Sequence, residues 1–157
     1  MSNRYSFEFF PPKTEAGREK LKDTRSQLAA LNPEFFSVTY GAGGSTRDNT
    51  RGIVLETKKA GLSVAPHLSF GGDEESEILE LLNSYKDAGI DRIVALRGDI
   101  PSGMGATRLV YARELVEFIR KHTGDHFQLE VAAYPEIHPD GKSYDADIGF
   151  LKDKLNA

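Results

Sequence analysis

The feature that most constrains this chain is a strict alternation of short apolar segments with longer amphipathic ones. Each apolar segment is rich in β-branched and aromatic residues, and the set predicts strands at residues 5–10, 35–40, 63–70, 92–98 and 128–135. The charged segments between them carry apolar residues at helical spacing and predict helices at 13–32, 46–61, 71–89, 107–124 and 143–156. Such alternation favours a parallel sheet with right-handed crossovers, either open and doubly wound or closed into a barrel.

The two faces of the predicted strands differ in size and polarity. We assign one face, suited to packing on helices, to Phe7, Phe9, Val38, Val64, Pro66, Leu68, Val94 and Leu96. The opposite face is small or polar and carries Ser6, Glu8, Ser37, Thr39, Ala65, His67, Ala95 and Arg97. A small, polar face suits the inside of a barrel or a lined cavity, so this detail favours the barrel. The polar residues gather near the C-terminal ends of the strands, where parallel architectures place their active sites.

Composition narrows the class of protein. The chain has 157 residues, enough for one domain, with 39% hydrophobic and 28% charged residues. Its net charge of −4 gives no electrostatic reason to expect nucleic acid or an anionic membrane as a partner. The lack of cysteine excludes disulfides, thiolate catalysis and cysteine metal sites. With no secretion signal and no run of 18 apolar residues, we expect a soluble cytoplasmic protein.

The segment YSFEFFPPK, residues 5–13, places the carboxyl group of Glu8 within a run of aromatic residues. An ionised carboxylate is costly in apolar surroundings. Two interpretations stay open on these grounds. Glu8 is either a surface residue on an edge strand or a general acid that apolar surroundings hold in its protonated form.

Two further segments combine a strand end with residues able to meet a ligand. In VTYGAGGST, residues 38–46, a strand runs into a glycine-rich loop that matches neither common phosphate-binding pattern, with Thr39 at the strand end. The alternative is an ordinary turn capped by Ser45 or Thr46. In LRGDIP, Arg97 and Asp99 flank Gly98, either as an ion pair closing a turn or as charges beside an approachable backbone amide.

Histidines and carboxylates show no spacing typical of a metal site. His67 lies on the polar face of the third predicted strand, and His138 follows the fifth strand in AYPEIHPDG. The four histidines form no H-E-x-x-H pattern, and a lone histidine is more often a hydrogen-bonded structural residue than a ligand. We therefore predict no metal site.

Five segments together resemble one family. FEFFPPK, VTYGAGGST, APHLSF, ALRGD and AAYPEIHPD, in this order and spacing across residues 4–154, resemble the bacterial-type 5,10-methylenetetrahydrofolate reductase family. The resemblance implies a (β/α)8 TIM barrel that binds FAD. A barrel of this kind needs about 250 residues. We therefore expect residues 1–157 to be a single domain holding the first five β-α units, truncated in the fifth helix and lacking strands 6–8.

The resemblance also implies a reaction in one-carbon metabolism that serves methionine biosynthesis. FAD would be reduced by NADH or NADPH and would then reduce 5,10-methylenetetrahydrofolate to 5-methyltetrahydrofolate in a ping-pong sequence. Glu8 would be the general acid that protonates N5 of the folate and opens its ring, leaving an iminium that accepts hydride from the flavin. Asp99 would lie near the flavin and the pterin and support the positive charge. The complete protein is expected to be a homo-oligomer with small-molecule substrates.

The family positions that contact FAD through backbone, phosphate or ring can be carried over residue by residue. They are Thr39, Tyr40, Ala42, His67, Arg97, Gly98, Asp99, Ala112, Tyr134, His138, Asp147 and Lys154. Thr39 would lie beside the flavin where nicotinamide stacks. Two alternatives stay open: a non-catalytic half-barrel that binds flavin weakly at most, and another (β/α)-barrel enzyme without flavin. The absence of a lysine at a strand end counts against a Schiff-base aldolase.

Overall fold

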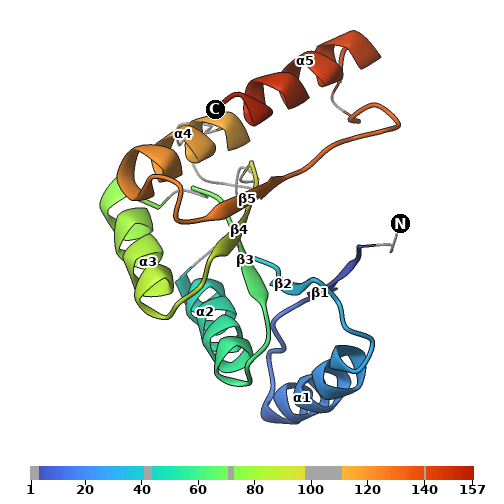
Figure 1. The fold of residues 1–157 in the computed structure, drawn as a ribbon, viewed down its shortest axis with the longest axis vertical. Helices are drawn as coiled ribbons and strands as arrows, with labels where there is room; N and C mark the ends of the chain where they lie inside the picture. Colours follow the sequence, from blue (N-terminus) through green and yellow to red (C-terminus); the bar gives the residue numbers. More distant parts are fainter. Residues whose placement is uncertain (1–3, 41–43, 71–72, 98–110, 140) are drawn as a thin grey trace.

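The computed structural model describes residues 4–40, 44–70, 73–97, 111–139 and 141–157. Strands and helices alternate along the chain (Figure 1). They are β1 Ser6–Phe9, α1 Glu15–Ala29, β2 Phe35–Val38, α2 Gly44–Lys59, β3 Val64–Leu68, α3 Glu75–Asp87, β4 Arg92–Ala95, α4 Ala112–Thr123, β5 Gln128–Val131 and α5 Tyr144–Leu155. Each predicted strand and helix is confirmed within the described residues. The observed elements are shorter at their ends, except that α2 begins at Gly44, two residues before its predicted start.

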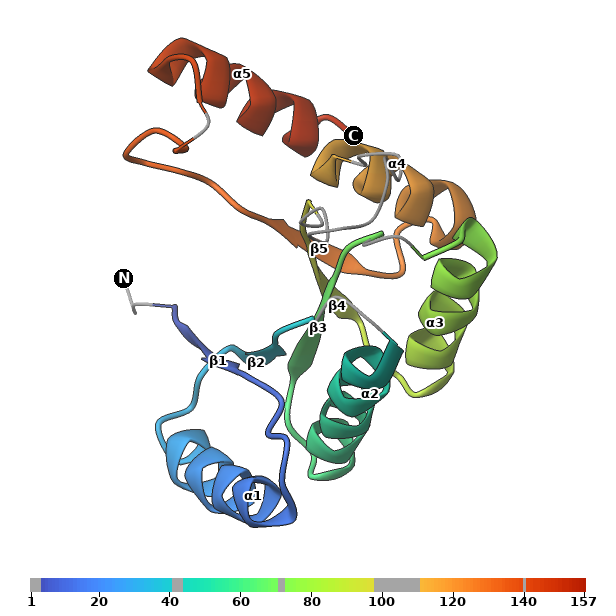
Figure 2. The ribbon, with the colours of Figure 1, turned by 180° about the vertical axis from the view of Figure 1, so that it is seen from behind.

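The sheet has the strand order β1-β2-β3-β4-β5, and each strand is parallel to its neighbour. Figures 1 and 2 show a curved sheet with the helices along its outer side. A doubly wound sheet reverses its strand order at a switch point, whereas this order never reverses. The fold is therefore an α/β fold consistent with part of a TIM barrel, as predicted.

The predicted faces hold for β1 to β3 but are wrong for β4. His67 of β3 lies beside Val94, and Leu68 lies beside Ala95. Since paired residues of neighbouring strands share a face, Ala95 points with Leu68 toward the helices and Val94 points inward with His67. Ile93 and Ala95 are fully buried in the core, whereas Val94 is only half-buried. The prediction that Val94 and Leu96 pack on helices is therefore overturned, and Ile93 and Ala95 take that place.

The hydrophobic core lies between the central strands and the helices that follow them. Its buried members from the strands and their connections are Val38, Val64, Leu68, Ile90, Ile93, Ala95 and Phe127. The helices α2, α3 and α4 contribute Ile53, Val54, Ile78, Leu81, Leu82, Tyr85, Leu115, Val116 and Ile119. At the β1 edge, Phe9 stacks on Phe36 with ring centroids 5.2 Å apart. The central part of the sheet is therefore the best-packed part of the molecule.

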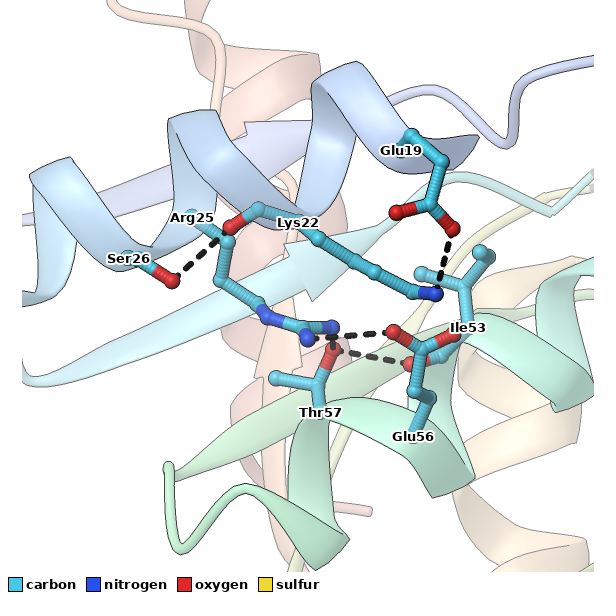
Figure 3. A network of polar contacts seen from close by, with 7 residues as sticks. All are labelled: Glu19, Lys22, Arg25, Ser26, Ile53, Glu56 and Thr57. Carbon is cyan, nitrogen blue, oxygen red and sulfur yellow. Dashed lines mark hydrogen bonds and ion pairs between the residues drawn. The ribbon is translucent and has the colours of Figure 1, made fainter. Parts of the chain in front are cut away.

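Helix α1 is held against α2 by a buried arginine (Figure 3). The Arg25 side chain is only 8% exposed, and its guanidinium donates to Thr57 Oγ1 at 2.9 Å and to Glu56 Oε1 at 3.1 Å. Thr57 in turn donates to the carbonyl of Ile53 at 2.8 Å. Because buried charges need partners, this network joins the two helices where apolar packing is thin.

Side-chain caps fix the start of two helices. Thr14 accepts from the Gly17 amide at 3.1 Å before α1, and Ser143 accepts from the Ala146 amide at 3.2 Å before α5. Helix α2 begins at Gly44, so Ser45 and Thr46 lie inside its first turn. The side chains of Ser45 and Thr46 lie outside the described part of the chain, so the capped turn stays a prediction.

Candidate functional site

Three of the predicted site residues meet on the inner face of the sheet near the C-terminal ends of β1, β2 and β3. The Thr39 hydroxyl donates to Glu8 Oε1 at 3.0 Å, and His67 Nε2 lies 3.9 Å from Glu8 Oε2. The backbone fixes this arrangement, because Glu8 lies beside Ser37 in the register and the Thr39 amide donates to the carbonyl of Phe9 at 2.9 Å. Adjacent parallel strands therefore place one carboxyl, one hydroxyl and one imidazole together.

Burial differs within this group. The Glu8 side chain is 51% exposed, whereas that of His67 is 8% exposed. Burial lowers the pKa of His67, and the charge of Glu8 opposes that change. The separation of 3.9 Å is too long for a hydrogen bond, so the imidazole is a close neighbour of the carboxyl group and not its hydrogen-bond partner.

Of the two interpretations left open for Glu8, the one that requires apolar surroundings is not met among the described residues, where the side chain is half exposed. The aromatic residues beside it in sequence, Phe7 and Phe9, occupy the opposite face of β1, because side chains alternate along a strand. Glu8 shares its own face with Ser37 and His67, which are polar, and β1 is an edge strand. The aromatic run therefore describes the far face of the strand and not the surroundings of the carboxyl group.

Tyr40 belongs to a second polar group, which joins the segments after β2 and β3. Its hydroxyl donates to Asp73 Oδ2 at 2.5 Å. Arg47, in the first turns of α2, lies 3.6 Å from Asp73 Oδ1 and 3.5 Å from Glu77 Oε1. Burial first, and then the hydrogen bond to Asp73, raise the pKa of Tyr40, so this phenol acts as a donor. The network fixes the two connections relative to each other.

The predicted residues Tyr134, His138, Asp147 and Lys154 form a third group, between β5 and α5. The rings of Tyr134 and His138 lie 4.5 Å apart at 76°. Asp147 Oδ2 accepts from the His138 amide at 2.6 Å, and Lys154 donates to the carbonyl of Ala132. Burial lowers the pKa of Lys154, and Asp147 opposes that change. This group lies at the β5 edge, whereas Glu8 lies at the β1 edge of the same sheet.

The remaining predicted residues are more scattered. Arg97 is exposed just after β4, and Ala112 begins α4. Three predicted site residues, Ala42, Gly98 and Asp99, lie outside the described residues. The structure therefore brings two groups of predicted residues together, and it leaves the proximity of Asp99 to Glu8 a prediction.

A charged cluster that was not predicted lies at the other end of the strands. Arg92 pairs with Glu130 and, at 3.0 Å, with Glu34, which also pairs with Arg4 at 2.7 Å. The Arg92 guanidinium lies 4.5 Å from the centre of the Phe35 ring. The alternation of Gln128 and Glu130 with Leu129 and Val131 was the signal that could have found it. Because the cluster lies at the N-terminal ends of β2 and β4, we assign it to stability.

Two kinds of feature, a metal-binding group and a membrane-spanning helix, are absent from the described residues. No group of three or more His, Asp or Glu side chains there is placed to hold a metal ion. No helix in the same part of the chain is both long and apolar enough to cross a membrane.

Comparison with known proteins connects these groups to a family. The family model of methylenetetrahydrofolate reductase matches residues 1–157. The 5,10-methylenetetrahydrofolate reductases of Escherichia coli K12 and Pectobacterium carotovorum are each 44% identical over 153 residues, which cover 97% of this chain. A probable methylenetetrahydrofolate reductase (NADH) of rice is 36% identical over 168 residues, which cover 98% of this chain and 28% of that protein.

The match covers nearly all of this chain but only about half of each bacterial relative. The matched region covers 50% of the Pectobacterium protein and 51% of the Escherichia protein, so this chain spans about half the length of these relatives. The family model nevertheless covers the whole of the chain, from the Glu8 strand to α5. The chain therefore belongs to the methylenetetrahydrofolate reductase family, whose named members are oxidoreductases.

Proposed function

We propose that this chain provides the acid-bearing part of an enzyme that reduces 5,10-methylenetetrahydrofolate to 5-methyltetrahydrofolate with FAD and NAD(P)H. Family membership supports the reaction class. The observation that carries the proposal is the Glu8 carboxyl group, fixed by the Thr39 hydroxyl at 3.0 Å at the C-terminal side of the sheet. Active sites of parallel barrels are built at that end of the strands.

The described residues have the chemistry that a flavin dinucleotide needs. Thr39 and His67 offer a hydroxyl and a neutral imidazole on the inner face, and Lys154 offers a cation for a pyrophosphate. Tyr134 is 48% exposed, so its ring is accessible for stacking on a planar group. The other proposed flavin contacts are Tyr40, Ala42, Arg97, Gly98, Asp99, Ala112, His138 and Asp147. When bound, the flavin supplies hydride transfer.

The two oxygens of Glu8 have different surroundings, and this assigns the proton. Oε1 accepts from Thr39, whereas Oε2 faces His67 at 3.9 Å. We place the transferable proton on Oε2, from which it passes to N5 of the folate as the ring opens. Burial lowers the pKa of the His67 imidazole beside Oε2, which disfavours a positive charge on that ring. Asp99 is proposed to stabilise the positive charge that develops on the folate.

Half-reactions of the Glu8→Gln variant test this assignment. The amide keeps the shape of the side chain and still accepts from Thr39, but it does not donate an acidic proton. Flavin reduction by NADH or NADPH should keep its rate, and reoxidation by methylenetetrahydrofolate should slow by about 100-fold or more, as expected for loss of a general acid. Stopped-flow absorbance of the flavin measures both steps and identifies the preferred nucleotide. Folate reduction at the normal rate would contradict the role of Glu8.

A second candidate function is a flavin-binding half-barrel without folate turnover. Two observations favour it: the chain spans about half the length of its bacterial relatives, and β1 and β5 each pair on one side only within the described sheet. Titration of the folded 157-residue chain with FAD, followed by flavin fluorescence, separates the candidates. Saturable binding without turnover of folate supports the half-barrel. Binding with turnover supports the enzyme, and no binding by a folded chain contradicts both.

We also propose that the protein is cytoplasmic and self-associates. Phe10 is 75% exposed next to the β1 edge, and Phe150 is 62% exposed on α5 near the β5 edge. Large exposed aromatic residues at both edges favour association, because apolar surface is removed from water. Sedimentation velocity of the chain and of a Phe10→Ser variant measures this. A monomer at every concentration would contradict self-association.

A further inference from the structure

The segment between β5 and α5, residues 132–143, contains a turn that its own sequence disfavours. Ile137 has a φ of +46°, which is rare for a β-branched residue because its Cβ crowds the backbone. Such strain persists only where surrounding contacts fix the chain. One of these contacts lies within the turn itself, where the Gly141 amide donates to the carbonyl of His138 at 2.7 Å.

Helix α5 provides the other contacts, at two points that enclose Tyr134 and reach His138. Asp147 Oδ2 accepts from the His138 amide at 2.6 Å, and Lys154 Nζ donates to the carbonyl of Ala132. Asp147 and Lys154 are seven residues apart, two helical turns, so they project from the same face of α5. Helix α5 thus holds the segment at two points, before Tyr134 and at His138. We call these two hydrogen bonds the grip.

Gly141 has a steric role in this arrangement. A Cβ at this position would lie 2.8 Å from Asp147 Oδ1 and 2.9 Å from Asp147 Oδ2. It would also lie 2.9 Å from the carbonyl oxygen of His138. The carboxylate of Asp147 can therefore approach the His138 amide closely only because residue 141 has no side chain.

The grip matters because α5 has little apolar attachment of its own. None of its residues is buried, and Tyr144, Ile148, Phe150 and Leu155 are exposed. Polar bonds therefore carry a large share of the link between α5 and the β5 segment. Between the two gripped points lie the Tyr134 and His138 rings, packed edge to face with centroids 4.5 Å apart.

We infer that Asp147 and Lys154 are positioning residues, which hold residues 132–138 so that the Tyr134–His138 ring pair faces a planar ligand. The inference rests on the proposed function for the identity of that ligand, FAD. This role is additional to the proposed contacts of both residues with FAD, because the carboxylate and the ammonium also bond to main-chain atoms of the protein. A merely electrostatic role toward the cofactor would leave the ligand-free segment unchanged when either residue is replaced.

Amide hydrogen exchange of the ligand-free 157-residue chain, read by NMR, tests the grip. Asp147→Ala should speed exchange of the His138 amide by about tenfold, as expected for the loss of one charge-assisted hydrogen bond. The matched control is Asp145→Ala, which removes an exposed carboxylate from the same helical turn. Equal exchange of His138 in wild type and Asp147→Ala, or equal acceleration in the control, would overturn the inference.

A second variant covers the case in which Asp147→Ala unravels α5. Gly141→Ala leaves Asp147 and the Ser143 cap in place but puts a methyl group against the carboxylate. It should also speed exchange of the His138 amide. For Lys154, the pair Lys154→Met and Lys152→Met compares the gripping cation with an exposed one, and only the former should loosen the segment.

An FAD titration of the same variants separates this inference from the proposed function. If wild type binds FAD, Asp147→Ala should weaken the affinity by about tenfold and Asp145→Ala should not. If wild type fails to bind FAD but His138 exchange still accelerates, the grip stands and the proposed function fails. If wild type binds FAD and exchange is unchanged in both Asp147→Ala and Gly141→Ala, the grip is refuted and the proposed function stands.

Discussion

The centre of the molecule and its two outer helices are held by different forces. Strands β2 to β4 and helices α2 to α4 share a continuous apolar core, in which Leu82, Ile93 and Ile119 are fully buried. In contrast, α1 buries only Arg25, and α5 buries none of its residues. This difference indicates that apolar burial stabilises the middle of the sheet, whereas individual polar contacts attach the outer helices α1 and α5.

The largest expected effect comes from replacing a core residue, and the replacement of an exposed residue is its control. Leu82→Ala removes a side chain that is 0% exposed, and it should lower the free energy of unfolding by about 2–5 kcal/mol. Phe150→Ala on α5 should change it by less than about 0.5 kcal/mol, because this ring is 62% exposed. Urea denaturation followed by circular dichroism measures both. Comparable losses would break the distinction between centre and ends.

An intermediate effect is expected at α1. Arg25→Met keeps much of the side-chain volume but removes the hydrogen bonds to Thr57 and Glu56. The free energy of unfolding should fall by about 1.5–3 kcal/mol, as for buried hydrogen bonds of a charged group. Lys22→Met on the same helix, which removes an exposed pair with Glu19, is the control and should have little effect. A stability equal to wild type would show that apolar packing alone attaches α1.

The smallest expected effect is on how stability depends on pH. It tests whether the buried His67 of β3, beside Glu8 of the edge strand, contributes to stability. Burial lowers the pKa of His67 below its unfolded value of about 6.5. The folded state therefore prefers the neutral imidazole, and its contribution to stability is present above that pH and is lost as pH falls below it. Glu8 opposes this loss. Urea midpoints between pH 7.5 and 5.5 should decline less in His67→Gln than in wild type.

The exposed His122 provides the comparison for this experiment. His122→Gln should keep the wild-type slope of stability against pH, because this side chain lies on the surface of α4. If the His67 and His122 variants had equal slopes, the burial of His67 would have no consequence for stability. That result would remove the energetic link between the inner face and the rest of the sheet.

Much of the fold followed from the sequence, because apolar segments and helical spacing are local signals. The orientation of β4 did not follow. Its sequence RIVA continues into Leu96, so apolar residues occupy both faces and alternation gives no preference. The pairing of His67 with Val94 decides the matter, and this pairing is a tertiary property. A strand with apolar residues on both faces must therefore be oriented from its neighbours.

The candidate site was only partly predictable for a similar reason. The strand ends indicated Glu8, Thr39 and His67, and the structure brings these three together. The aromatic residues around Glu8 in sequence gave a false impression of its surroundings, because neighbours along a strand point to opposite faces. Ion pairs such as Arg92 with Glu130 join residues 38 positions apart, so the alternation in β5 could indicate the face of Glu130 but not its partner.

The sequential strand order has a consequence for how the protein forms during synthesis. Each of the strands β2 to β5 pairs with the one made immediately before it, so each of these β-α units finds its template already present when it leaves the ribosome. Within the described sheet, none of the pairings between neighbouring strands has to wait for a distant partner, which limits the time that the newest edge is exposed to other chains. A sheet with a reversed strand order would lack this property, since some of its strands would pair only with later ones.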